Sequence, residues 1–205
     1  MPARPSLVCF DLGGVFIRLQ PDLASACRDA GVEFRGGWEH LPSDAPRLAL
    51  IERYQVGAME CGPYYRAMSD LSAGRYSPEE IEAIHRVWVI EPYPGIDRLL
   101  DEIESAGLAT ACLSNTNVSH WRWLEGVAAF ARLHHKHASH LLRFHKPDER
   151  IYRAFEREVG RSRREIILFD DLPENVEAAT RLGWQAHRID PRGDAAEQMR
   201  QVLRL

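Results

Sequence analysis

The sequence predicts an α/β protein in which a doubly wound parallel sheet forms the core and a helical cap is inserted after the first strand. One observation behind this prediction is that short apolar runs alternate with helical patterns over most of the chain. The other is that residues 20–92 separate the first apolar run from the second and contain helical patterns only. A crossover between neighbouring parallel strands needs far fewer residues, so this segment is expected to be an insertion.

The predicted strands are short and apolar, as buried parallel strands are. They are "SLVCFD" (6–11), "LATACLS" (108–114) and "EIILFD" (165–170). Each run ends in a polar side chain, which is Asp11, Ser114 or Asp170. Segments 134–139 and 184–189 are less apolar and are candidates for two further strands.

Apolar residues recur at helical spacing between these strands and inside the insertion. Helices are predicted between the strands at 94–107, 147–160 and 173–183, and in the insertion at 45–57, 62–74 and 77–89. Strands that alternate with helices favour right-handed β-α-β units and a parallel sheet with helices on both faces. We therefore expect residues 1–19 and 93–205 to form the core and residues 20–92 to form the cap.

The composition is that of a globular protein. The chain has 205 residues and a formal net charge of −4, which argues against a general nucleic-acid-binding protein. No stretch approaches the roughly 20 apolar residues of a membrane span, and the apolar run near the N-terminus is too short for a signal peptide. A cytoplasmic location is the expectation. The four cysteines show no paired spacing and are expected to be buried thiols.

Polar residues that follow the predicted strands are the candidates for a functional site, because ligands of such sheets bind beyond the carboxyl ends of the strands. Asp11, Ser114 and Asp170 occupy these ends, Asp171 follows directly, and Lys146 precedes the helix before the Asp170 strand. Taken singly, these residues also suit turns and helix caps. Together they place three carboxylates, a hydroxyl and an ammonium at one edge of the sheet.

This combination of groups favours phosphate chemistry with a metal ion. Clustered carboxylates raise one another's pKa unless a cation neutralises them, and oxygen ligands suit Mg²⁺. A hydroxyl and an ammonium are good phosphate donors, and the backbone N–H groups of Gly13, Gly14 and Asn115 can add to them. One carboxylate would remain as a nucleophile.

Four segments occur in the order "FDLGGV", "LSNTN", "HKPDERIY" and "FDDLPENV", at separations that cover nearly the whole chain. Together they resemble the four motifs of the haloacid dehalogenase-like hydrolase superfamily. The variant is most similar to the branch that holds bacterial sugar-phosphate phosphatases and the phosphatase domain of soluble epoxide hydrolases. The resemblance implies a Rossmann-like core with a helical cap after the first motif, which agrees with the insertion inferred from patterning.

The resemblance also implies a role for each matching residue. Asp11 would be the nucleophile. Lys146 would stabilise the phosphoryl charge and hold Asp11 in place. Ser114 and the backbone of Asn115 would bind the phosphoryl oxygens.

The cofactor implied by the resemblance is Mg²⁺. Its expected ligands include Asp11 and the backbone carbonyl of Gly13. Asp171 is expected to contact the ion directly, with Asp170 beside it or acting through water. Asn175 would orient this acidic pair.

The sequence departs from the commonest family pattern at Gly13. Most phosphatases of the family carry an Asp there, which protonates the leaving group and then deprotonates the attacking water. General acid–base catalysis is typically worth about 10²–10⁴-fold in rate. Some members of the branch share the glycine. A water, a cap residue, or a leaving group that needs no proton, such as that of an aryl or acyl phosphate, would replace the acid.

The sequence thus predicts a Mg²⁺-dependent phosphatase of a small phosphorylated metabolite, a sugar phosphate being one candidate, that works through an aspartyl phosphate. Neither nucleic acid nor membrane is expected as a partner. One alternative is a non-catalytic binding module of the same fold, which Gly13 favours. Another is a 2-haloacid dehalogenase, because halide leaves without a proton. Dehalogenases work without metal and lack the acidic pair, so Asp170 and Asp171 argue against that alternative.

Two further groups of residues carry weaker signals. Histidines crowd one segment: His134, His135, His137, His140 and His145. They have no recognised metal-ligand spacing, so a surface edge strand is favoured over a second metal site, although His145 adjoins Lys146. Aromatic residues of the predicted cap are expected mainly to pack helices, with one or two lining a substrate pocket: Trp38, Tyr54, Tyr64, Tyr65 and Trp88.

Overall fold

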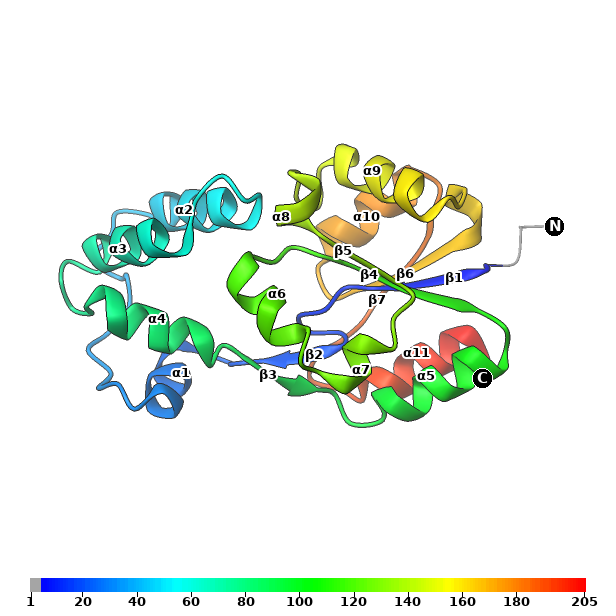
Figure 1. The fold of residues 1–205 in the computed structure, drawn as a ribbon, viewed down its shortest axis with the longest axis horizontal. Helices are drawn as coiled ribbons and strands as arrows, with labels where there is room; N and C mark the ends of the chain where they lie inside the picture. Colours follow the sequence, from blue (N-terminus) through cyan, green and yellow to red (C-terminus); the bar gives the residue numbers. More distant parts are fainter. Residues whose placement is uncertain (1–4) are drawn as a thin grey trace.

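A computed structural model describes residues 5–205. Its centre is a sheet of five parallel strands in the order β5-β4-β1-β6-β7 (Figure 1). The strands are β1 (Leu7–Phe10), β4 (Ala109–Ser114), β5 (His135–Ala138), β6 (Ile166–Asp170) and β7 (Gln185–Arg188). The central strand β1 pairs with β4 and β6, so that Leu7 lies opposite Ala109 and Ile166. This confirms the predicted α/β class and places the ends of β1, β4 and β6 side by side.

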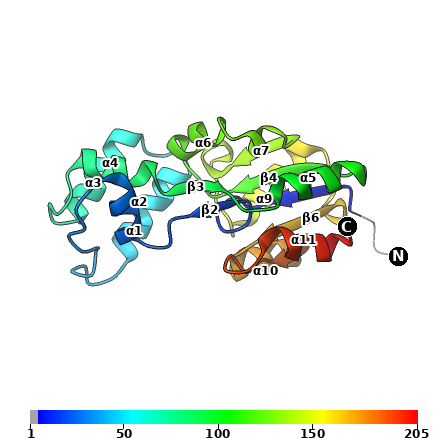
Figure 2. The ribbon, with the colours of Figure 1, turned by 90° about the horizontal axis from the view of Figure 1, so that it is seen from below.

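Helices cover both faces of the sheet (Figures 1 and 2). One face carries α5 (Ile96–Ser105), α6 (Val118–Leu124), α7 (Ala128–Ala131) and α11 (Ala195–Leu203). The other carries α9 (Glu149–Val159) and α10 (Pro173–Arg181), and the short helix α8 (Ser139–Leu142) lies beside α9. A 3₁₀ turn, Arg163–Glu165, precedes β6.

The alternation of side chains along β1 explains this two-sided arrangement. Val8 and Phe10 join the apolar cluster under α5 and α11, whereas Leu7 and Cys9 join the cluster under α9 and α10. Successive side chains of a strand point to opposite faces, so a strand that is apolar throughout must be covered on both. Burial of these residues is the main stabilising term of the core.

Four helices lie to one side of the sheet in Figure 1 and pack around an apolar cluster of their own. They are α1 (Leu23–Ala30), α2 (Ala45–Gln55), α3 (Cys61–Leu71) and α4 (Pro78–Arg86). Two short antiparallel strands, β2 (Ile17–Leu19) and β3 (Val89–Pro92), connect this helical part to the sheet. We propose that these helices are the cap, and we use that word for them below.

The expected helices and strands are present, with ends that differ by a few residues. The expectation that 20–92 contains no strand is wrong at its end, because Val89–Pro92 forms β3. The helices α1, α6, α7, α8 and α11 were not expected from the sequence. Most of them are shorter than the window in which helical periodicity can be recognised. Within residues 5–205, no helix is both long and apolar enough to cross a membrane.

The cap and the core touch through polar groups on two sides. On one side, the buried Ser139 hydroxyl lies 2.6 Å from the carbonyl oxygen of Gln55, at the end of α2, and accepts from the Thr116 amide at 3.0 Å. On the other side, the rings of His85 in α4 and His120 in α6 stack, with their centroids 4.0 Å apart. These contacts hold the cap over the carboxyl edge of the sheet.

The hydrogen bonds of the histidine pair are satisfied when both rings are neutral. His120 Nε2 donates to the His85 carbonyl at 2.8 Å, and the Asn117 amide donates to His120 Nδ1 at 3.3 Å. The remaining contact, from His85 Nε2 to Asn117 Oδ1, is 3.3 Å long. Burial lowers the pKa of His85 to about 3, with a further contribution from His120, and burial lowers that of His120 to about 4.

Because this buried pair is neutral, we expect the protein to lose stability in mild acid. Unfolded histidines take up protons below a pKa of about 6.5, whereas the folded pair stays neutral down to about pH 4. Stability is then complete above the unfolded pKa and falls as the pH drops toward the folded values. Denaturant unfolding should show a free energy of unfolding lower at pH 5 than at pH 7 by about 2 kcal/mol per histidine.

The double variant His85→Gln/His120→Gln should lose most of this pH dependence. His40→Gln, at an exposed histidine of the cap, should keep it. An unchanged pH profile in the double variant would contradict a neutral buried pair.

Candidate active site

Three carboxylates meet at the carboxyl edge of the sheet. Asp11 follows β1, Asp170 ends β6 and Asp171 comes next, and one potential ligand oxygen from each lies within 4.8 Å of the others. Asp11 and Asp170 are buried, at 8% and 0% exposure, while Asp171 is partly exposed. The structure thus brings together the three acids that the sequence placed at strand ends.

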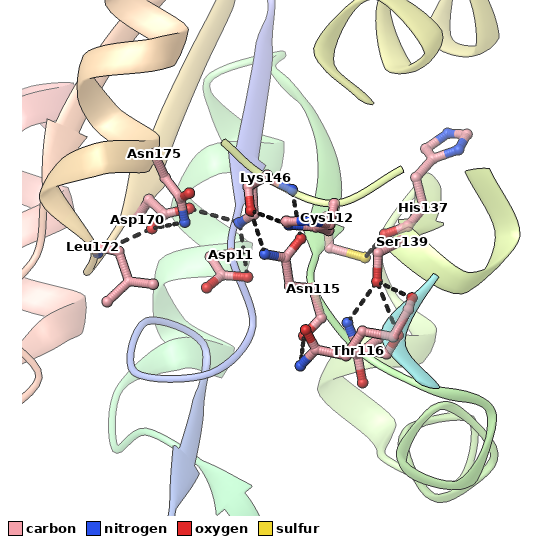
Figure 3. A network of polar contacts seen from close by, with 12 residues as sticks. Asp11, Cys112, Asn115, Thr116, His137, Ser139, Lys146, Asp170, Leu172 and Asn175 are labelled. Carbon is pink, nitrogen blue, oxygen red and sulfur yellow. Dashed lines mark hydrogen bonds and ion pairs between the residues drawn. The ribbon is translucent and has the colours of Figure 1, made fainter. Parts of the chain in front are cut away.

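Lys146 lies between two of these acids and is itself buried (Figure 3). Its Nζ is 2.6 Å from Asp170 Oδ2 and 3.0 Å from Asp11 Oδ1. Asn115 fixes the lysine backbone from the other side, because its amide donates to the Lys146 carbonyl at 2.8 Å and its oxygen accepts from the Lys146 amide at 2.7 Å. The side chain of Asn115 therefore holds Lys146, a role that the sequence did not suggest.

Both oxygens of Asp170 have hydrogen-bond partners. Oδ2 accepts from Lys146, and Oδ1 accepts from the Leu172 amide at 3.0 Å and from the Asn175 side chain at 2.9 Å. Asn175, in the first turn of α10, thus contacts the acidic pair through Asp170. Because Asp170 is fully engaged and Asp171 is more exposed, Asp171 is the better placed of the two to contact an ion directly.

The electrostatics of the cluster show an excess of negative charge. Burial raises the pKa of the Asp11 carboxyl, and the charge of Asp170 adds to this effect against the opposing effect of Lys146. Burial, together with Asp11 and Asp170, raises the pKa of Asp171 to about 6. Burial alone would lower the pKa of Lys146, but Asp11 and Asp170 outweigh it and raise that pKa. One ammonium therefore does not neutralise three neighbouring carboxylates.

The donor set fits a hard divalent cation. Its members are all carboxylate oxygens, which Mg²⁺ and Ca²⁺ prefer over softer ligands. Asp11 Oδ1 is buried and shares the Lys146 ammonium, 3.0 Å away, with Asp170. One ammonium shared by two buried carboxylates leaves net negative charge, which is costly unless a cation compensates it, and a cation here would also oppose the rise of the Asp171 pKa.

The loop after Asp11 contains two glycines with different constraints. Gly14 has a left-handed φ of +77°, and a Cβ on it would lie 2.7 Å from Asp171 Oδ2. Gly13 has no such backbone, and a Cβ there would meet only the side-chain end of Leu19, at 2.8 Å from Cδ1. Gly14 is therefore required by conformation and by close approach, whereas Gly13 leaves room for a side chain if Leu19 moves.

A cavity of about 750 Å³ lies between cap and core and reaches the site at Gly13, Ser114 and Asn115. Ser114, the last residue of β4, is buried and lines this cavity. The cap aromatics that line it are Trp38, Tyr54, Tyr64 and Trp88. More of them face the cavity than the sequence suggested, because helical packing alone does not show which side of each ring faces an opening.

The histidine segment lies apart from the acidic cluster. His135 and His137 stack on the edge strand β5 with ring centroids 6.4 Å apart, and Asp11, Asp170 and Asp171 form the sole metal-compatible cluster found within residues 5–205. His145 contacts the carbonyl of Lys146 at 2.8 Å and Glu52 of α2 at 3.0 Å. It thus links the cap to the loop that carries Lys146.

Comparison with known proteins gives a family and a curated relative. The model of a family described as haloacid dehalogenase-like hydrolase matches residues 5–183. The protein "Phosphatase MT3486" of Mycobacterium tuberculosis (strain CDC 1551 / Oshkosh) is 26% identical over 130 residues, which cover 62% of this chain and 60% of the relative. The similarity therefore spans less than two thirds of the relative's length.

Solved structures share the fold at low identity. The HAD family enzyme BT-2542 of Bacteroides thetaiotaomicron superposes with a TM-score of 0.80 at 18% identity, over 97% of this chain and all of the other. Its complex with magnesium and inorganic phosphate gives 0.78 at 19%, over 96% and 100%. L-2-haloacid dehalogenase of Xanthobacter autotrophicus, with chloropropionic acid covalently bound, gives 0.62 at 17%, over 97% and 82%. These similarities confirm the predicted fold.

A pair of glycine variants tests whether the approach of Gly14 to Asp171 matters. Gly14→Ala and Gly107→Ala both place alanine at a left-handed φ, which costs about 1–2 kcal/mol. Only the first also pushes a Cβ into a carboxylate, since no heavy atom lies within 4 Å of the Cβ position at Gly107. Thermal unfolding should show that both variants lose stability through the shared backbone term, while calorimetry should show Mg²⁺ affinity reduced only in Gly14→Ala. Equal Mg²⁺ affinities would contradict the assigned role of Asp171.

Proposed function

This chain belongs to the haloacid dehalogenase-like hydrolases, and from that membership we propose that it is a Mg²⁺-dependent phosphatase of small phosphorylated metabolites. The observation that carries the proposal is the buried Lys146 ammonium, held between Asp11 and Asp170 with Asp171 beside them. The curated phosphatase relative and the magnesium and phosphate complex of BT-2542 support it.

In this proposal Asp11 is the nucleophile. Its oxygen bonds to the phosphorus as the bond to the leaving oxygen breaks, and water then hydrolyses the aspartyl phosphate to release inorganic phosphate and free Asp11. The nearby ammonium of Lys146 favours the ionised carboxylate and faces the charge that develops on the phosphoryl group. The Asn115 side chain holds the backbone of Lys146, so the ammonium does not have to move during the reaction.

The phosphoryl group is proposed to bind where the cavity meets the sheet. Ser114 supplies a hydroxyl and Asn115 a backbone N–H at the end of β4, since both line the cavity there. Mg²⁺, when bound, would be held by Asp11, Asp171 and the carbonyl of Gly13, and would supply positive charge to the phosphoryl oxygens. Asp170 would act through Lys146 and Asn175, because its two oxygens are already engaged.

The acidic pair separates this proposal from a dehalogenase. Displacement of halide from a neutral carbon needs a carboxylate nucleophile but no cluster of further carboxylates beside it. Here Asp170 and Asp171 add negative charge beside the nucleophile, which a bound cation would neutralise so that an anionic phosphoryl group can approach. Release of halide from 2-chloropropionate would favour the dehalogenase alternative.

Loss of the nucleophile is the direct test of the mechanism. Asp11→Asn should lower turnover of aryl phosphates by at least about 1,000-fold, because no covalent intermediate can form in the usual way. Chelation of metal from the wild type should abolish turnover, and added Mg²⁺ should restore it. Steady-state release of inorganic phosphate measures both effects.

Asp70→Asn is the matched control, since this carboxylate is exposed on α3 and lies outside the cluster. It should turn over phosphate esters like the wild type. Full activity of Asp11→Asn would refute the aspartyl-phosphate mechanism, and a wild type inactive on every phosphate ester would favour a binding module.

Gly13→Asp tests whether an acid is missing from the site. Because the neighbouring Leu19 side chain is 39% exposed and can move, the variant is expected to fold. A carboxyl there should protonate a poor leaving group, so hydrolysis of alkyl phosphates should rise by about 10-fold or more, while aryl phosphates, whose leaving groups need no proton, should change little. Parallel kcat measurements on both ester classes give the comparison.

Gly13→Asn has nearly the same shape without an acidic proton and serves as the steric control. It should show no selective gain on alkyl esters. An equal effect of Gly13→Asp on both ester classes would contradict the missing-acid explanation.

A further inference from the structure

The cavity between cap and core has a predominantly apolar section on its cap side. Side chains of three cap helices form this section, among them Ile51 from α2, Met68 from α3, and Ile81 and Ile84 from α4. Trp38 and Trp88 add two indole rings. A volume of about 750 Å³ lies within the range of sites that enclose ligands of drug-like size. A phosphoryl group fills only a small part of it.

Polar residues line other parts of the cavity. Ser114, Asn115 and Gln55 lie at the sheet end, where the Gln55 side chain donates to the Asn115 carbonyl at 3.4 Å. The charged lining residues are Glu39, Asp44 and Arg47. Arg47 lies in the first turn of α2 and Gln55 ends this helix, so eight residues at 1.5 Å each separate the two along the helix by about 12 Å.

The charged residues of the lining offer few free hydrogen-bonding groups to a polyhydroxylated ligand. Arg47 is paired with Asp44 at 3.0 Å and lies over the Trp38 ring. The histidines on the wall do not add charge, because His85 and His120 are neutral and donate to Asn117 and to a backbone carbonyl. Hydroxyl groups buried against the apolar section would lose their bonds to water without replacement, at a cost in binding for each group.

The absence of an acidic side chain at position 13 also argues against a polyhydroxylated ligand such as a sugar phosphate. With glycine at position 13, the leaving oxygen receives no proton from a side chain there. An aryl oxide leaves as a stable anion, whereas the alkoxide of a sugar does not. The size and apolar wall of the cavity and the leaving-group chemistry therefore favour an aryl group over a sugar.

Building on the proposed phosphatase function, we propose that the substrates of this site are aryl phosphates whose ring system occupies the apolar section between Ile51, Met68 and Ile84. Asp11 attacks the phosphorus, and the bond between phosphorus and the aryl oxygen breaks with its electron pair going to oxygen. Water hydrolyses the aspartyl phosphate, and the proton that this water loses balances the one that the aryl oxide takes up. The net products are a phenol and inorganic phosphate.

The first test compares esters in the presence of Mg²⁺. The probes are 2-naphthyl phosphate, glucose 6-phosphate and acetyl phosphate, the last of which has a good leaving group but no ring. Transfer of a two-ring group from water into the cavity should raise kcat/KM by about 100-fold over the sugar ester. Equal or better turnover of glucose 6-phosphate would overturn the inference and leave the phosphatase function standing.

The second test changes the cavity wall. Ile51→Asn puts an amide into the apolar section and should raise the KM for 2-naphthyl phosphate by about 10-fold, while acetyl phosphate, which does not reach this section, should react as in the wild type. Leu48→Asn makes the same change one turn earlier in α2, at a side chain that is 53% exposed and outside the cavity, and should leave both substrates unaffected. Equal effects of the two variants would count against the assigned position of the ring.

A binding measurement separates this inference from the phosphatase function. Trp38 and Trp88 line the cavity, so 2-naphthol should quench tryptophan fluorescence at saturation in the wild type and in Asp11→Asn, and about 10-fold more weakly in Ile51→Asn. If no ester is hydrolysed but this pattern holds, the phosphatase function fails and the aryl site stands. If 2-naphthol binds all variants alike or none, the aryl site is refuted.

Discussion

The buried ammonium of Lys146 is the interaction on which the rest of the site depends. Removing a charge from water costs several kcal/mol unless partners compensate it, and here Asp11 and Asp170 do so at 3.0 and 2.6 Å. Both acids depend on the lysine in turn, since both are buried. Only the shared edge of three parallel strands brings such groups together from distant parts of the chain, so the sheet order and the ion cluster require each other.

Much of this edge could be predicted from sequence because strand ends carry a local signal. An apolar run that stops at Asp11 or Asp170 indicates both the strand and the position of its last residue in a parallel sheet. The clamp from the Asn115 side chain and the stack of His85 on His120 carry no such signal. They depend on how the loop after β4 and the cap helices approach each other, and no spacing within either segment encodes that approach. For the same reason, the sequence does not show how many aromatic residues of the cap face the cavity.

The cavity changes the interpretation of Gly13. From sequence it marks the absence of a proton donor, which weakens the case for an active enzyme. In the structure it lines the same cavity as apolar residues such as Ile51 and Ile84. A site that takes aryl esters has less need of an acid, because an aryl oxide leaves as a stable anion. The glycine and the apolar wall are thus compatible features of one proposed specificity.

The loop that carries Gly13 and Gly14 also connects Asp11 to the cap. Asp11 ends the ladder of β1 through a hydrogen bond to the Phe169 carbonyl, and Gly14 donates to the Ile17 carbonyl, at the start of β2, at 3.0 Å. Because β2 pairs with β3 and both lead into the cap, a shift of the cap must pass through this short loop. Ser139, His145 and the histidine stack oppose such a shift from the other sides. The geometry around Asp11 therefore depends on cap contacts as well as on the sheet, and the fit of a ligand between cap and core bears on the position of Asp11.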